Sequence, residues 1–101
     1  MGQRLDLQAI LEALLGSGNV YFQPPATVQM QYPAIVYRRD DIDTEFAGNQ
    51  PYRLTKRYQV TVISRDPDSI IPGKVAELPT CTFDRFYVAD QLNHDVFKLY
   101  F

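Results

Sequence analysis

The fold is decided by the stretch Arg57-Tyr58-Gln59-Val60-Thr61-Val62, in which large apolar and polar side chains alternate. Tyr58, Val60 and Val62 fall on one side of an extended chain and polar residues on the other, which is the period of two that a half-buried β-strand shows. The sequence therefore predicts a long strand over residues 52–64, with one face in the core.

A second strand is predicted upstream. Pro33 introduces Ala34-Ile35-Val36-Tyr37, a run rich in strand-forming residues that indicates a central strand. A polar loop is expected to follow over residues 40–51, because this segment is acidic and contains turn formers such as Gly48 and Asn49. The two strands and the loop predict a long hairpin with an extended tip.

The longer of two predicted helices lies near the N-terminus. Its apolar residues recur at i, i+3, i+4, i+7 and i+8, one full stripe of a helix. These residues are Leu7, Ile10, Leu11, Leu14 and Leu15. Asp6 is expected to cap the helix, and Gly16 to end it in the left-handed conformation. The run Val20-Tyr21-Phe22 is stopped by Pro24-Pro25, so it is at most an edge strand.

The C-terminal part predicts a short helix and a second hairpin. Apolar residues at i, i+4 and i+7 indicate a helix over residues 71–78, which Pro79 is expected to end. Strand-like segments follow at residues 82–88 and 96–101, with a turn near residues 90–93. The hairpin supplies the last two strands of the sheet.

The order of these elements predicts the fold class. A chain of 101 residues suits one domain, residues 1–101. We expect an α+β fold in which an antiparallel sheet of about four to five strands carries one long and one short helix on the same face.

Composition argues against several classes of function. The net charge is −2 with acids and bases mixed along the chain, so no basic surface is expected to bind nucleic acid in a sequence-specific way. No apolar stretch approaches the roughly 20 residues that span a bilayer, so no membrane partner is expected. The single cysteine, Cys81, excludes an intrachain disulfide and suits a reducing cytoplasm.

The sequence offers little for catalysis, metal binding or cofactors. His94 and Asp95 are adjacent, but neighbours on a strand point to opposite faces, so no catalytic dyad is expected. Cys81 has no basic neighbour in sequence and is interpreted as a small buried residue. One His and one Cys give no metal-ligand spacing. We therefore expect no catalytic residue, no metal and no cofactor.

Charge is segregated in the first hairpin. The acidic side comprises Asp40, Asp41, Asp43 and Glu45, and the basic side Arg53, Lys56 and Arg57. These charges could balance each other within one molecule. Alternatively, the acidic segment of one subunit could contact the basic segment of a neighbour, which would favour partner choice more than affinity. The seven residues are therefore candidates for a subunit interface.

The C-terminal section contains Leu78-Pro79, then the segment from Phe83 to Asp90 and the segment from Leu92 to Phe101. In these residues the chain resembles tail-terminator (tail-completion) proteins of long-tailed bacteriophages. The layout upstream agrees, with an amphipathic helix, a Pro-Ala-Ile-Val-Tyr strand and an acidic segment in the same order.

This resemblance implies a mechanical role. It implies a non-enzymatic homo-oligomeric ring, commonly a hexamer, that docks on the head-proximal end of the tail tube and stops its polymerisation. Its partners would be the tail tube protein and a head-completion or neck protein. The subunit would be assembled in the host cytoplasm and reside in the virion.

Three alternatives remain open at this stage. The chain could be another phage neck or connector component that caps a different surface. It could be a stand-alone α+β ligand-binding module, which would need a sizeable cavity. A small enzyme would need a pocket with converging titratable groups, and the sequence does not display one.

Overall fold

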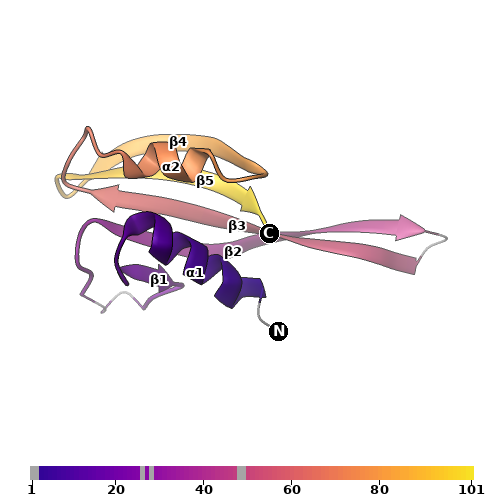
Figure 1. The fold of residues 1–101 in the computed structure, drawn as a ribbon. Helices are drawn as coiled ribbons and strands as arrows, with labels where there is room; N and C mark the ends of the chain where they lie inside the picture. Colours follow the sequence, from indigo (N-terminus) through magenta and orange to yellow (C-terminus); the bar gives the residue numbers. More distant parts are fainter. Residues whose placement is uncertain (1–2, 26, 28, 48–49) are drawn as a thin grey trace.

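The computed structural model describes residues 3–25, 27, 29–47 and 50–101, with the backbone alone for residues 3, 41–47 and 50–55. It confirms the α+β class (Figure 1). The elements are α1 (Gln3–Leu15), β1 (Val20–Phe22), β2 (Ala34–Ala47), β3 (Gln50–Ser64), α2 (Ile71–Ala76), β4 (Cys81–Ala89) and β5 (Leu92–Tyr100). The strands form one five-stranded sheet in the order β1-β2-β3-β5-β4. All neighbours are antiparallel except β1 and β2, which are parallel.

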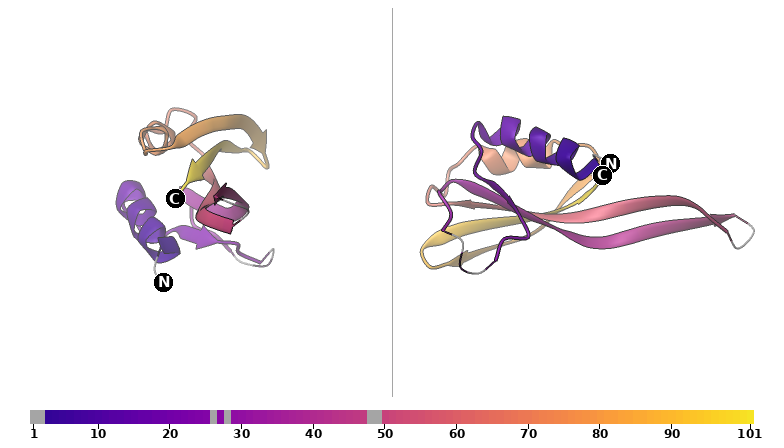
Figure 2. Two further views of the ribbon diagram at one scale, coloured as in Figure 1. Left: turned by 90° about the vertical axis from the view of Figure 1, so that its right-hand side faces the viewer. Right: turned by 90° about the horizontal axis from the view of Figure 1, so that it is seen from below.

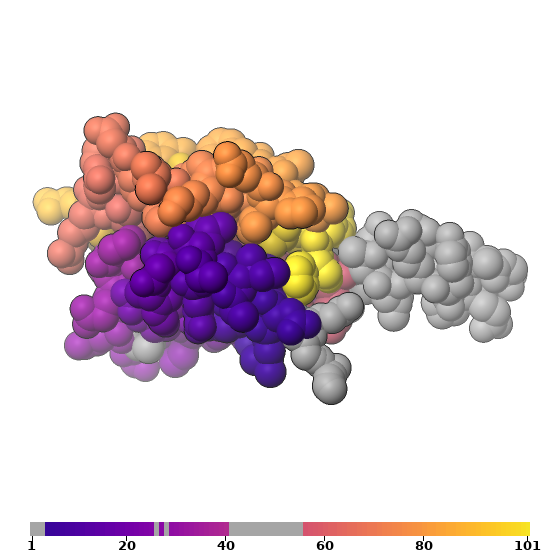
Figure 3. All heavy atoms as spheres, in the orientation of Figure 1, coloured from indigo at the N-terminus to yellow at the C-terminus, as the bar shows by residue number. Residues whose placement is uncertain are grey.

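Both helices lie on one face of this sheet, as expected (Figure 2, right), and they pack against each other (Figure 3). Tyr58, Val60 and Val62 of β3 are at most 2% exposed, so the alternation in this strand does direct one face into the core. α1 contributes Leu7 and Leu11 to the same cluster. The other core residues are Val20, Ile35, Tyr37, Ile71, Val75, Phe97 and Leu99.

α1 begins earlier than the sequence pattern predicts. It starts at Gln3, so Asp6 lies in its first turn and the expected capping role is wrong. Arg4 holds this extra turn, because its guanidinium donates to Tyr37 Oη (3.3 Å) and lies 4.4 Å from the centre of the Phe22 ring. Gly16 ends the helix with φ of 83°, as predicted.

The predicted polar loop over residues 40–51 is wrong, because β2 continues to Ala47 and β3 starts at Gln50. Ladder pairing continues from Asp41 opposite Arg57 to Ala47 opposite Gln50. The register places Glu45 opposite Arg53. We call residues 41–47 and 50–55 the arm. It projects beyond the helices (Figure 1), and the molecule measures 50 × 24 × 23 Å.

The remaining elements have the predicted type, but two of them differ in their bounds. β1 is a three-residue edge strand. α2 has a proline in its first turn and ends at Ala76, before the expected stop at Pro79. β5 begins at Leu92, four residues before the predicted strand, because the turn is tighter than expected. The C-terminal hairpin turns at Asp90 and Gln91, whose φ angles of 53° and 64° match the two-residue turn that suits the twist of antiparallel strands.

Candidate interaction surfaces

A polar cluster lies on the face of the sheet opposite the helices. Asp40 Oδ2 accepts from Lys98 Nζ (2.6 Å) and Arg57 Nε (3.0 Å). The side chain of Asp40 is only 15% exposed. The hydrogen bond from Lys98 is the main cause that holds the pKa of Asp40 below its usual value. Asp40 therefore remains ionised and joins β2, β3 and β5.

This cluster accounts for two of the seven candidate interface residues. Asp40 and Arg57 form an ion pair within one chain, which favours internal charge balance for that pair. The side chains of Asp41, Asp43, Glu45 and Arg53 lie outside the described part of the chain. Sequence reasoning missed Lys98, because its contact with Asp40 depends on the register between β3 and β5.

A basic pocket of about 340 Å³ opens at the base of the arm. Its lining residues are Arg4, Phe22, Gln23, Arg39, Lys56 and Tyr58. Arg4 is engaged by Tyr37 and Phe22. The side chains of Arg39 and Lys56 have no hydrogen-bond or ion-pair partner in the chain as described. None of the described residues that line the pocket carries a carboxylate, so these residues give it an excess of positive charge.

β4 forms an apolar edge of the sheet. The strand has β5 on one side and no neighbour on the other within the described residues. Four of its large side chains are exposed, namely Phe83 (57%), Phe86 (51%), Tyr87 (41%) and Val88 (60%). Sequence reasoning did not single them out, although the density of aromatic residues in this stretch was a usable signal.

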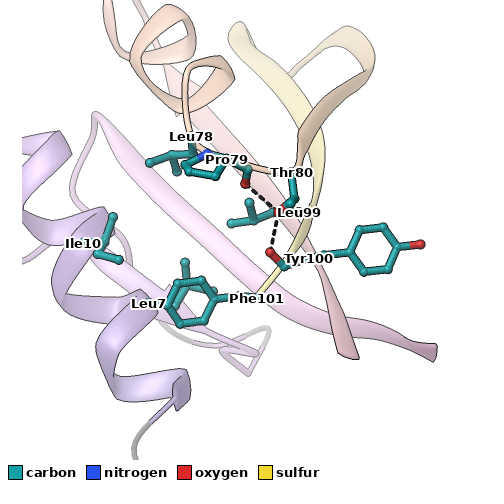
Figure 4. A pocket seen from close by; sticks show the side chains of 8 residues that line it. All are labelled: Leu7, Ile10, Leu78, Pro79, Thr80, Leu99, Tyr100 and Phe101. Atoms are coloured by element: carbon teal, nitrogen blue, oxygen red, sulfur yellow. Dashed lines mark hydrogen bonds between the residues drawn. The ribbon is translucent and has the colours of Figure 1, made fainter. Parts of the chain in front are cut away.

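An apolar pocket of about 300 Å³ lies between α1 and the C-terminal end of β5 (Figure 4). Its lining residues are Leu7, Ile10, Leu78, Pro79, Thr80, Leu99, Tyr100 and Phe101. The Thr80 hydroxyl is already used, because it donates to Tyr100 O at 2.6 Å. The phenol ring of Tyr100 points away from the pocket (Figure 4). The lining can accept an apolar group but presents no converging acid–base groups.

The two residues that sequence reasoning considered for catalysis have structural surroundings. The His94 ring stacks on Tyr87, with centroids 4.6 Å apart, and Nδ1 lies 3.1 Å from Leu92 O. Burial raises the pKa of the Cys81 thiol, whereas a nucleophilic cysteine needs a lowered pKa. Over residues 3–25, 27, 29–47 and 50–101, no group of three or more His, Cys, Asp or Glu side chains is placed to bind a metal ion.

Neither the length of the helices nor the comparison with known proteins assigns a function to these surfaces. None of the described helices combines the length and apolar character that crossing a bilayer requires. Searches against family models, curated proteins and solved structures find no match to this chain. The resemblance to tail terminators therefore remains a prediction.

Proposed function

We propose that this chain is a non-enzymatic structural subunit of a long-tailed phage. It forms a ring, most simply a hexamer, that terminates the tail tube at its head-proximal end and provides the surface for head joining. The observation that carries the proposal is the presence of two surfaces suited to assembly on one small chain, the apolar edge of β4 and the arm.

Open strands and exposed aromatic residues favour assembly. An unpaired edge invites pairing with another chain, and aromatic side chains are enriched in interface cores. The two edges of this sheet are unequal, since β1 has three residues and β4 has nine. Pairing of β1 of one copy with β4 of the next would therefore leave most of β4 uncovered. A ring requires only that one patch fit a different patch on the next copy.

In this proposal the candidate interface residues contribute to the contact between neighbouring subunits. The basic side now comprises Lys56 together with Arg4 and Arg39, because Arg57 already pairs with Asp40 in its own chain. The acidic side comprises Asp41, Asp43 and Glu45 of the arm. The ring's partners are the tail tube protein on one side and a head-completion or neck protein on the other, within the virion.

A ligand-binding module is the second candidate function. The apolar pocket of about 300 Å³ favours it, but this volume is at the lower limit of about 300–1,000 Å³ for ligand sites. The charged residues of the arm and the exposed aromatic residues of β4 have no role in such a module. The ring therefore accounts for more of the molecule.

Native mass spectrometry with negative-stain microscopy tests the proposal. We expect the chain alone to form a closed oligomer, or to form a ring when purified tail tubes are added. In either case the ring should stop further growth of the tubes. A chain that stays monomeric with and without tubes, and leaves tube length unchanged, would contradict the ring. Tight binding of a small apolar molecule by such a monomer would support the second candidate.

A further inference from the structure

The basic pocket holds positive charge that no described side chain of its own molecule neutralises. The side chains of Arg39 and Lys56 have no hydrogen-bond or ion-pair partner among the described residues, and Arg4 supplies a third cation. The rings of Phe22 and Tyr58 line the same pocket. Three cations that line one pocket attract a negatively charged group, so the pocket favours a bound carboxylate.

The arm contains the acidic stretch Asp41, Asp43 and Glu45. The ladder pairs Ile42 with Lys56 and then continues away from the pocket to Ala47 and Gln50. The arm thus projects beyond the helices of its own molecule (Figure 1). None of the described side chains that line the pocket is acidic, so we look for its acidic occupant on another molecule.

We propose that the basic pocket binds the acidic strand of the arm of a second copy. This inference rests on the ring under Proposed function and specifies its contact. Pocket and arm are different patches of one chain, so the contact can repeat from copy to copy and close a ring. A phosphate backbone suits the pocket less well, because nucleic-acid sites need a broad basic surface and this chain has a net charge of −2.

Charge reversal in the full-length chain tests this contact. The arm variant carries Asp43→Lys and Glu45→Lys, and the pocket variant carries Arg39→Glu and Lys56→Glu. Arg39 and Lys56 were chosen because their reversal breaks no ion pair within the described chain. Lys74→Glu, on the exposed side of α2, is the matched control. Circular dichroism melts first verify that every variant folds.

Native mass spectrometry then compares each variant alone with an equimolar mixture of the two. Each variant alone should need at least about tenfold more protein to assemble, because like charges oppose each other at the contact. The mixture should restore rings, since the reversed arm fits the reversed pocket while the second variant's arm fits the first variant's pocket. The control should assemble like the wild type.

The outcomes separate this inference from the ring itself. Rings that form equally well with either variant alone would overturn the contact and leave the proposed function intact. So would a mixture that fails to restore assembly of two folded variants. A wild-type chain that never assembles, even on tail tubes, would overturn both.

Discussion

Asp40 illustrates how one residue can determine the arrangement of three strands. Its carboxylate lies between Lys98 and Arg57, so β2, β3 and β5 meet at this side chain. The side chain is 15% exposed, which makes the contact stronger than a surface ion pair. The register shift between Arg39 and Asp41 occurs at this residue and gives β2 the extra residue that forms the contact.

Asp40→Asn should therefore destabilise the chain and change its response to acid. The loss at neutral pH should be about 1–2 kcal/mol, because two charge-assisted hydrogen bonds are weakened. Since the pKa of Asp40 is lowered in the folded state, its stabilisation is present above the unfolded pKa of about 4 and is lost as pH falls through the folded pKa. Urea unfolding from pH 7 to 3 measures this. A variant with the wild-type acid profile would contradict it.

Asp95 should behave in the opposite way. Burial is the main cause that raises its pKa in the folded state, and the nearby His94 only partly offsets it. An ionised Asp95 therefore opposes folding, and this penalty is relieved as pH falls through the raised folded pKa. Asp95→Asn should match or exceed the wild-type melting temperature at pH 7 and lose that advantage in acid. A clear loss of stability at pH 7 would show that the carboxylate has a favourable partner.

At the scale of elements, α1 is held by packing more than by its own propensity. Leu11 is fully buried, whereas Leu5 is 59% exposed on the same helix. Leu11→Ala should cost about 2–5 kcal/mol because it leaves a cavity in the core. Leu5→Ala, the matched control, should change stability by less than about 0.5 kcal/mol. Denaturant unfolding compares the two, and equal losses would mean that Leu11 is not part of the core.

β4 is the element where assembly and folding can be separated. Phe86 and Val88 are 51% and 60% exposed, so Phe86→Lys with Val88→Lys should leave the monomer folded. Lysine on an edge strand discourages pairing with another chain. We expect the double variant to lose oligomers or tube binding, as read by native mass spectrometry and co-sedimentation with tail tubes. Ile70→Lys, at a position 69% exposed outside the strand, is the control. Unchanged assembly would exclude β4 as a contact.

At the scale of the whole molecule, the sequence correctly predicted those features of the fold that depend on short repeating patterns of apolar residues. The alternation at Tyr58, Val60 and Val62 identified the buried strand face, and the spacing of Leu7 and Leu11 identified the helix face, because burial repeats with the period of each element. The α+β class and the position of both helices on one face followed from the order of the predicted elements, because one sheet can bury both helices on a single face.

The arm and the charged surfaces could not be predicted in the same way. Residues 40–51 have the composition of a loop, and only pairing of the two halves across the hairpin makes them strands. Lys98 is far from Asp40 in sequence, and Arg4 is far from Lys56. Such contacts depend on strand order and register, which local composition does not specify.

The shape of the molecule also has a consequence for measurement in solution. Extents of 50 × 24 × 23 Å describe a rod with an axial ratio of about two. A rod rotates more slowly about its short axes than about its long one. NMR relaxation rates of amides in α1 and in the strands should thus depend on bond direction, whereas incorporation into a ring would replace this pattern by the slow tumbling of a disc.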